Sequence, residues 1–191
     1  MVMGKHGVTA NTTKNILLGA GTYHKNLKWA SNAWTGDIIG ATSGGGKVTI
    51  VGELKKLDVD GAMVNVKGLT VKQGGEAKME VNVAEITTDI LKTATLFEEG
   101  SSTSGNLTML QDKANIEEGD YLENFGFVGK TEGGKDIIVI FESALCTSGL
   151  DFDLKNKEQA VLKLTMEAYA DIDSDLDVLP VKIYYPDAAT A

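Results

Sequence analysis

Apolar and polar residues alternate along most of the chain, which is the pattern of β-strands that bury one face. The pattern predicts strands in nine segments, at 15–29, 48–59, 62–71, 77–83, 106–110, 121–129, 135–146, 161–166 and 178–186. Residues 84–97 have helical spacing instead, because one helix face then holds Ile86, Ile90, Leu91 and Ala94. We therefore expect a mainly β fold with one short helix.

Residues 30–46 and 98–106 are rich in glycine and small polar residues, which predicts loops. Residues 1–15 are also small and polar, so we expect a flexible N-terminal arm there. The remaining length suits one large domain, and we assign a single domain to residues 16–191.

The dipeptide Asp60-Gly61 lies between two alternating segments, which is the strongest short-range signal of a β-hairpin. A two-residue turn there would pair Val59 with Ala62, Leu57 with Val64 and Lys55 with Val66. Each strand would run for roughly 12 residues, or about 40 Å, whereas a usual strand has about 5–6 residues.

The apolar side chains of this predicted hairpin change face part of the way along it. On the first strand the change falls between Leu54 and Leu57, and on the second it falls across Gly68. A change of face requires a bulge or a bend. Because both strands need one at the same height, we expect the hairpin to leave its own sheet and to contact another surface.

The glycine-rich segment GATSGGGK at 40–47 superficially matches a phosphate-binding loop. When the G-x-x-x-x-G-K-[ST] pattern is aligned on Lys47, Ala41 occupies the first glycine position and Val48 the Ser/Thr position. The residues that follow alternate like a strand, so no helix N-terminus is there to hold a phosphate. We interpret the glycines at 44–46 as a flexible hinge that enters the hairpin.

The number, type and distribution of charged residues narrow the range of possible functions further. All 18 basic residues are lysines and the net charge is −9, which argues against a reader of nucleic-acid sequence because arginine is the favoured residue for that task. Residues 1–75 carry nine lysines and four acidic residues, whereas residues 76–191 carry nine lysines and 23 acidic residues. This asymmetry is typical of two surfaces that meet head to tail.

No segment predicts insertion into a membrane or secretion. The longest apolar run, IIVIF at 137–141, is far too short to span a bilayer, and the N-terminal residues lack the apolar core of a signal peptide. The single cysteine, Cys146, lies among apolar residues and is expected to be a buried thiol.

Three groups of residues are candidate sites of chemistry. His6 and His24 have no sequence neighbours that suggest a triad or a metal site. The acidic run DIDSDLD has the spacing of a calcium loop but carries leucine and lysine where that loop needs glycine and glutamate, and on a strand its carboxylates would line one face. Trp29 and Trp34 flank a predicted loop and could form a platform for a sugar, although core or interface packing is the commoner role.

The order and spacing of several segments carry a family resemblance. The segments GAGTYHKNLKW, GATSGGGKVTI, KKLDVDGAMVNVKGL and MEVNVAEITTDILKTA are followed by DYLENFGFVG, GGKDIIVIFESALC, AVLKLTMEAYAD and LPVKIYY. In this order the chain resembles the tail tube proteins of long-tailed bacteriophages over nearly its whole length. The glycine-led hairpin, followed by a strand and a helix, is the most specific part.

The resemblance implies a β-sandwich or barrel-like domain flanked by one helix, in a structural protein of the virion tail rather than an enzyme. Six copies would form a ring, and rings would stack around a tape-measure protein into the tube that conducts DNA during ejection. Tail terminator and distal tail proteins would be further partners, and assembly would take place in the host cytoplasm. It implies no cofactor, no metal, no membrane contact and no specific binding of the passing DNA.

In such proteins the long hairpin, the loop before it and the N-terminal arm make contacts between subunits. The resemblance therefore implies a set of subunit-contact candidates, namely Gly44, Gly45, Gly46, Lys55, Lys56, Asp60, Gly61 and Met63. The candidates for the lumen wall are Asp171, Asp173, Asp175 and Asp177. An acidic wall would repel DNA weakly, over a Debye length of about 8 Å, and would let it slide. The alternative function is an all-β binding module of a virion or cell surface, similar to a lectin or an adhesin.

Overall fold

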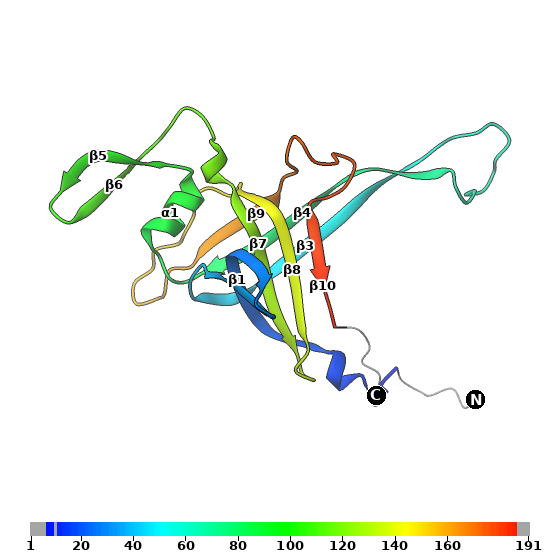
Figure 1. Ribbon diagram of the computed structural model, residues 1–191, viewed down its shortest axis with the longest axis horizontal. Helices are drawn as coiled ribbons and strands as arrows, with labels where there is room; N and C mark the ends of the chain where they lie inside the picture. Colours follow the sequence, from blue (N-terminus) through cyan, green and yellow to red (C-terminus); the bar gives the residue numbers. More distant parts are fainter. Residues whose placement is uncertain (1–6, 10, 187–191) are drawn as a thin grey trace.

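The computed structural model describes residues 7–9 and 11–186, which form ten β-strands and one α-helix (Figure 1). The strands are β1 (Leu17–Ala30), β2 (Ala33–Ile38), β3 (Thr42–Lys56), β4 (Thr70–Val83), β5 (Glu98–Ser104), β6 (Leu107–Gln111), β7 (Leu122–Thr131), β8 (Asp136–Cys146), β9 (Leu162–Ala168) and β10 (Val181–Tyr184). The helix is α1 (Thr88–Thr95), and short 3-10 turns are η1 (Thr13–Asn15) and η2 (Glu118–Asp120). The mainly β fold with one helix is confirmed.

Eight strands form one antiparallel sheet, in the order β2-β1-β7-β8-β9-β4-β3, with β10 added to β8. The first half of β8 pairs with β10, as Phe141 with Val181, and its last residues pair with β9, as Ala144 with Ala168. The strands β5 and β6 form a separate two-stranded sheet. The sheet therefore divides at β8, which gives its two halves room to curve toward each other.

The sheet curls around its main core. Tyr23 lies on β1 and Gly46 on β3, near opposite ends of the strand order, yet a Cβ atom at Gly46 would collide with the Tyr23 hydroxyl group. The core inside the curl has contributions from β1, β4, β7, β8, β9 and α1, and its largest fully buried side chains are Tyr23, Phe125, Phe141, Met79, Leu162, Leu164, Met166, Val81 and Val83. The result is a barrel-like architecture with α1 packed against it.

The strand β8 is buried on both faces, which explains its continuous apolar run. Val139 and Phe141 point into the main core, whereas Ile138 and Ile140 join Leu27 in a second apolar cluster on the other face. Cys146, at the end of β8, is buried as expected.

Two predicted loops are strands in the structure, so these predictions were wrong. Residues 30–46 contain β2 and the beginning of β3, and residues 98–106 contain β5. The strand β2 buries almost nothing, and the glycine-rich beginning of β3 is at most half-buried. Such strands are held by backbone hydrogen bonds rather than by a buried face, so no apolar alternation marks them in the sequence.

The helix is shorter than the predicted 84–97. The side-chain oxygen of Thr87 accepts a hydrogen bond from the backbone N–H of Ile90, 3.3 Å away, and fixes the first turn at Thr88. Leu96 adopts a left-handed conformation that ends the helix. Ile90 and Ala94 are buried as predicted, but Ile86 lies before the helix and is exposed.

The hairpin exists and Asp60-Gly61 does form a turn, but the predicted pairing of Leu57 with Val64 and of Lys55 with Val66 was wrong. Lys55 pairs with Val71 and Lys56 with Thr70, so the strands end there and residues 57–69 form a loop. Within the loop Asp60 and Gly61 occupy a turn closed by the hydrogen bond from Ala62 N–H to the Val59 carbonyl. All side chains from Leu57 to Gly68 are exposed, and without a face to bury the alternating residues do not extend the ladder.

A bulge or bend was predicted on both strands of the hairpin, between Leu54 and Leu57 and at Gly68, but the structure has its bulge on the return strand at a different place. Glu53 pairs with Gly74 and Leu54 with Lys72, which leaves Gln73 as the extra residue of a bulge. The apparent slip beyond Leu54 reflects the end of the strands rather than a second bulge.

Candidate assembly surface

The most unusual surface of the molecule is the far part of the β3–β4 hairpin, residues 50–73, which we call the arm. Every residue from Ile50 to Gly68 is exposed, and Figure 1 shows the arm extending well beyond the curled sheet. The ladder that supports it is continuous with the core part of the hairpin, because Ile50 pairs with Ala77 and Val51 with Glu76. The arm is therefore an extension of the sheet rather than a loose loop.

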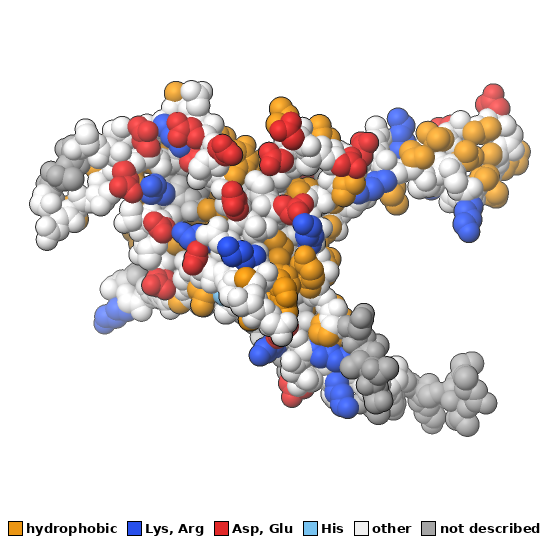
Figure 2. Space-filling model, viewed as in Figure 1, with side chains coloured by type: hydrophobic (Ala, Val, Ile, Leu, Met, Phe, Trp, Pro, Cys, Tyr) orange, Lys and Arg blue, Asp and Glu red, His pale blue; other side chains and the backbone are white. Residues whose placement is uncertain are grey.

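The end of the arm is apolar. Met63 is 98% exposed and Val64 is 77% exposed, and hydrophobic side chains gather at this end of the molecule in Figure 2. The other exposed apolar residues of the arm are Ile50, Val51, Leu54, Leu57, Val59, Val66 and Val71. A contiguous exposed apolar patch of this kind typically marks an interaction site.

The structure brings only some of the predicted contact residues together. Lys55 and Lys56 are the last residues of β3, and Asp60, Gly61 and Met63 lie in the loop 57–69, so these five share the arm. The glycine run lies at the opposite end of β3.

The glycine run at 44–46 lies within β3 and forms a bulge. The predicted flexible hinge before the strand was therefore wrong. Thr42 pairs with Val83 and Gly46 with Val81, so three residues of β3 face Asn82 alone. The side-chain amide of Asn82 donates a hydrogen bond of 3.0 Å to the Gly45 carbonyl, and both Gly44 and Gly45 have positive φ. The bulge bends β3 where it passes Tyr23.

The acidic run lies in a loop and not on a strand. Two successive turns hold it, with hydrogen bonds from Ser174 N–H to the Asp171 carbonyl and from Val178 N–H to the Asp175 carbonyl. The four predicted lumen residues are all exposed, and they are Asp171, Asp173, Asp175 and Asp177. Leu179, which follows the run, packs near Gly75 at the base of the arm, because a Cβ at Gly75 would lie 3.0 Å from Leu179 Cδ1.

The two tryptophans meet at the tip of the β1–β2 hairpin and belong to a groove. The rings of Trp29 and Trp34 lie 5.5 Å apart, and Tyr184 of β10 lies 4.8 Å from Trp34, each in an edge-to-face arrangement. We call this feature the aromatic groove; its volume is about 730 Å³. Sequence reasoning singled out the tryptophans but missed Tyr184, because β10 is distant in the chain.

A lysine on the rim of the aromatic groove is paired with a carboxylate. Lys182 donates a hydrogen bond to Glu142, and this interaction raises the pKa of Lys182. Trp29 is 56% exposed, so the groove offers at least one accessible ring.

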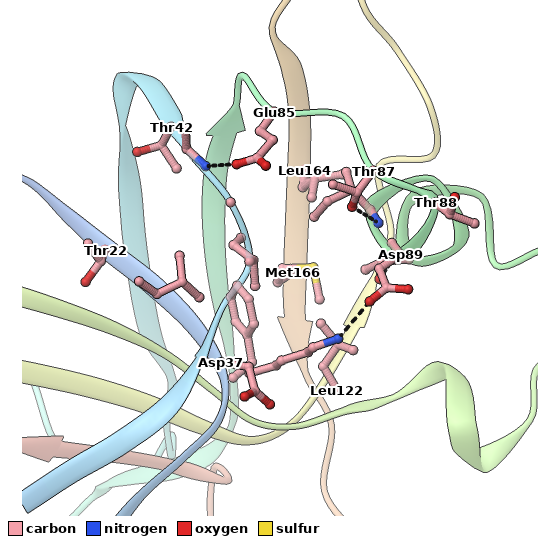
Figure 3. A pocket seen from close by; sticks show the side chains of 18 residues that line it. Thr22, Asp37, Thr42, Glu85, Thr87, Thr88, Asp89, Leu122, Leu164 and Met166 are labelled. Carbon is pink, nitrogen blue, oxygen red and sulfur yellow. Dashed lines mark hydrogen bonds and ion pairs between the residues drawn. The ribbon is translucent and has the colours of Figure 1, made fainter.

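A second cavity, of about 880 Å³, lies between α1 and the connection from β2 to β3, and we call it the α1 cavity (Figure 3). Its floor is made by the buried core residues Phe125, Leu164 and Met166. Its rim is polar: Lys25 forms an ion pair of 3.3 Å with Asp89. No sequence pattern pointed to this cavity, because its residues come from eight separate elements and connections.

The rim of the α1 cavity is fixed by local hydrogen bonds. A side-chain oxygen of Glu85 accepts a hydrogen bond of 3.1 Å from the Ala41 N–H, which ties the β2–β3 connection to the segment before α1. Ile38, at the end of β2, also lines the cavity and is 61% exposed. The cavity therefore has a structured mouth that is open to solvent.

The two histidines are the remaining candidates from the sequence. His6 lies outside the described residues. His24 lies on β1, where its Nε2 is 2.9 Å from the Thr22 hydroxyl. Within residues 7–9 and 11–186, no three histidine, cysteine or acidic side chains form a group that could hold a metal ion.

The predicted N-terminal arm is described in part. Residues 1–6 and 10 lie outside the described residues, whereas the Lys14 carbonyl accepts a hydrogen bond of 3.2 Å from Gly133 N–H in the β7–β8 turn. Within the described part of the chain, no helix has the length and apolar character needed to cross a bilayer.

No protein-family model matches this chain, and no curated protein matches its sequence.

Proposed function

We propose that this chain is a tail tube subunit of a long-tailed bacteriophage, in which rings of six copies stack into the conduit for DNA ejection. The observation that carries the proposal is the arm. The arm is an extension of the sheet whose residues are exposed from Ile50 to Gly68 and whose end is apolar. No other part of the described chain covers these residues. Another copy or partner protein would cover it.

The fold is suited to such an assembly. The described strands β2 and β3 are the two ends of the main sheet, so both offer backbone groups that a neighbouring copy can pair with. The arm and the rest of the sheet differ in shape, so a contact between them would be heterologous and would repeat around a ring or along a tube. The rings would stack around the tape-measure protein, and the tail terminator and distal tail proteins would be further partners.

A second candidate is an all-β binding module of a virion or cell surface, and the aromatic groove favours it. Exposed aromatic rings beside polar groups are the usual platform for a sugar, and Trp29 lies next to Trp34 and Tyr184 in that groove. This candidate leaves the arm without a role, so we place it second.

Removal of the arm's end tests the proposal. Lys56 and Thr70 are directly paired, so a two-residue Asn-Gly turn can join them in place of residues 57–69. We expect the shortened protein to keep its circular dichroism spectrum and melting temperature and to remain a monomer at concentrations where the full chain sediments as large particles.

The matched control is Trp29→Ala, which changes the aromatic groove and leaves the arm intact. Assembly that survives loss of residues 57–69 would contradict the proposal. Loss of glycan-array binding by Trp29→Ala, in a protein that forms no particles, would favour the binding module instead.

A further inference from the structure

Two hollows of the sheet core could receive the apolar end of an arm, and their charges differ. The rim of the α1 cavity carries one lysine and three acidic residues, for a net charge of −2, and these are Lys25, Asp37, Glu85 and Asp89. The lining of the aromatic groove carries two lysines and one aspartate, Lys28, Lys182 and Asp136, and the Glu142 carboxylate pairs with Lys182, so the four charges cancel.

The charge of the arm favours the first of these hollows. Residues 50–73 contain four lysines and three acidic residues, so the arm has a net charge of +1. The positive charge of the arm lies on its strands, at Lys55, Lys56 and Lys72, because the loop 57–69 has a net charge of −1. The acidic rim of the α1 cavity attracts these lysines, whereas the aromatic groove has no net charge to attract them.

The α1 cavity also matches the end of the arm in size and polarity. Its volume of about 880 Å³ falls within the range of roughly 300–1,000 Å³ that is typical of pockets that enclose a ligand, so two side chains fit. Its floor of Phe125, Leu164 and Met166 is apolar, as are Met63 and Val64. Insertion would remove the two most exposed apolar side chains of the loop from water.

The arm cannot fill the cavity of its own chain. Figure 1 shows the arm leaving the sheet toward one end of the molecule's long axis, whereas α1 lies toward the other end. A projection at one end and a receptor at the other generate head-to-tail contacts that repeat from copy to copy.

We propose that Met63 and Val64 of one copy insert into the α1 cavity of a second copy. This inference rests on the proposed self-assembly and names the receptor of the arm. Ile38 and Asp89 of the second copy line that receptor, where they would contact the loop 57–69 of the first copy.

A disulfide formed between two different copies tests this contact. Met63→Cys protein is mixed with Ile38→Cys protein that carries a longer affinity tag, and the mixture is oxidised under assembly conditions. Two cysteines form a disulfide only when their Cβ atoms approach to about 3.5–4.5 Å. The native Cys146 is 2% exposed and is present in every variant, so the parent protein gives the background.

The matched control replaces Ile38→Cys with Ile172→Cys, which changes another exposed isoleucine that does not line the cavity. We expect the Ile38 mixture to give about ten-fold more mixed dimer than the Ile172 mixture, because docking raises the effective concentration of one thiol near the other. Electron micrographs of the same samples report whether tubes form.

The outcomes separate the two proposals. Tubes without a preferential Met63–Ile38 cross-link would overturn the α1 cavity as the receptor and leave the proposed function standing. The absence of both tubes and cross-link would contradict both.

Discussion

Gly46 illustrates how a single residue sets the shape of this sheet. It lies on β3 where the strand passes the ring of Tyr23, and a side chain there would also meet the Glu80 carbonyl, 2.6 Å from the Cβ position. Burial raises the pKa of Tyr23, which is consistent with its hydroxyl group lying against the inner face of β3. The close approach of β1 and β3 therefore depends on a residue without a side chain.

We expect Gly46→Ala to destabilise the fold by about 1–3 kcal/mol, which is the usual cost of overpacking a core. Gly52 is the control, because it lies on the same strand and a Cβ there would meet only the end of the Lys72 side chain, at 3.9 Å. Urea unfolding of both variants measures the difference. Equal stabilities would show that β1 and β3 do not approach as closely as described.

Gly61 has the opposite character, since nothing lies within 4 Å of a Cβ at that position and only its φ of 86° restricts substitution. A β-branched residue resists this conformation, so Gly61→Val should disturb the loop 57–69 and leave the core unaffected. We expect slower assembly with a melting temperature close to that of the parent protein, measured by light scattering and calorimetry.

Gly105 provides the control for this prediction, because it too has positive φ and open space around it, in the turn between β5 and β6. If Gly105→Val slowed assembly as much as Gly61→Val, the loop 57–69 would have no special role.

At the scale of elements, the sequence was informative wherever a strand buries one face or both. The strands β7, β8 and β9, and the buried part of β4 at 77–83, follow from alternation or from continuous apolar runs and lie where they were expected. The whole of β4 is longer than predicted, because it runs without a break from Thr70 to Val83. The strand β2 was not predicted, because its residues are mostly exposed beside β1 and so carry no apolar alternation. Alternation also misled in residues 57–69, where apolar residues at every second position have no core to face.

The sequence indicated the arm but not the α1 cavity, because a sequence pattern reports only residues that are close together in the chain. The arm is continuous in sequence, so the Asp60-Gly61 turn and the long hairpin indicated it. The α1 cavity collects residues from β1, the β2–β3 connection, α1, β7 and β9, and only the fold brings these together. A local pattern cannot report a cavity of that kind.

The charges of the arm lead to a prediction at the same scale. Lys55 and Lys56 are exposed at the end of β3, where the loop 57–69 begins. A single surface ion pair contributes only about 0–1 kcal/mol, but every copy in a tube makes the same contact. We expect the double variant Lys55→Glu/Lys56→Glu to elongate tubes more slowly than the parent protein, by time-resolved light scattering.

Charge reversal at the acidic residues that the lysines would contact provides the control for the lysine double variant. Acidic-to-lysine changes at the α1 rim, such as Asp37→Lys, should restore part of the elongation rate of the lysine double variant. Elongation of that double variant at the parental rate would remove any contribution of these lysines to stacking.

At the scale of the whole molecule, the projecting arm and the acidic remainder of the chain have separate roles in the proposed tube. In that proposal Lys55 and Lys56 of the arm would meet the next copy, while part of the acidic excess would face the conduit, where it would keep DNA from adhering. The exposed loop with Asp171, Asp173, Asp175 and Asp177 is the candidate for that wall.

Neutralising the four aspartates of the proposed lumen wall should affect the passage of DNA and not the assembly of tubes. With all four aspartates changed to asparagine, we expect tubes to elongate at the parental rate and DNA ejection from reconstituted tails to slow down, as measured by release of a fluorescent DNA dye. Impaired elongation with normal ejection would place these residues at a subunit contact instead.

Electron microscopy of the purified full-length protein at high concentration tests the central claim most directly. If this chain is a tail tube subunit, micrographs will show hollow tubes of uniform diameter, and end-on views will average to six-fold symmetry. A protein that remains monomeric, or that stops at a closed dimer, at every concentration and salt tested would contradict it.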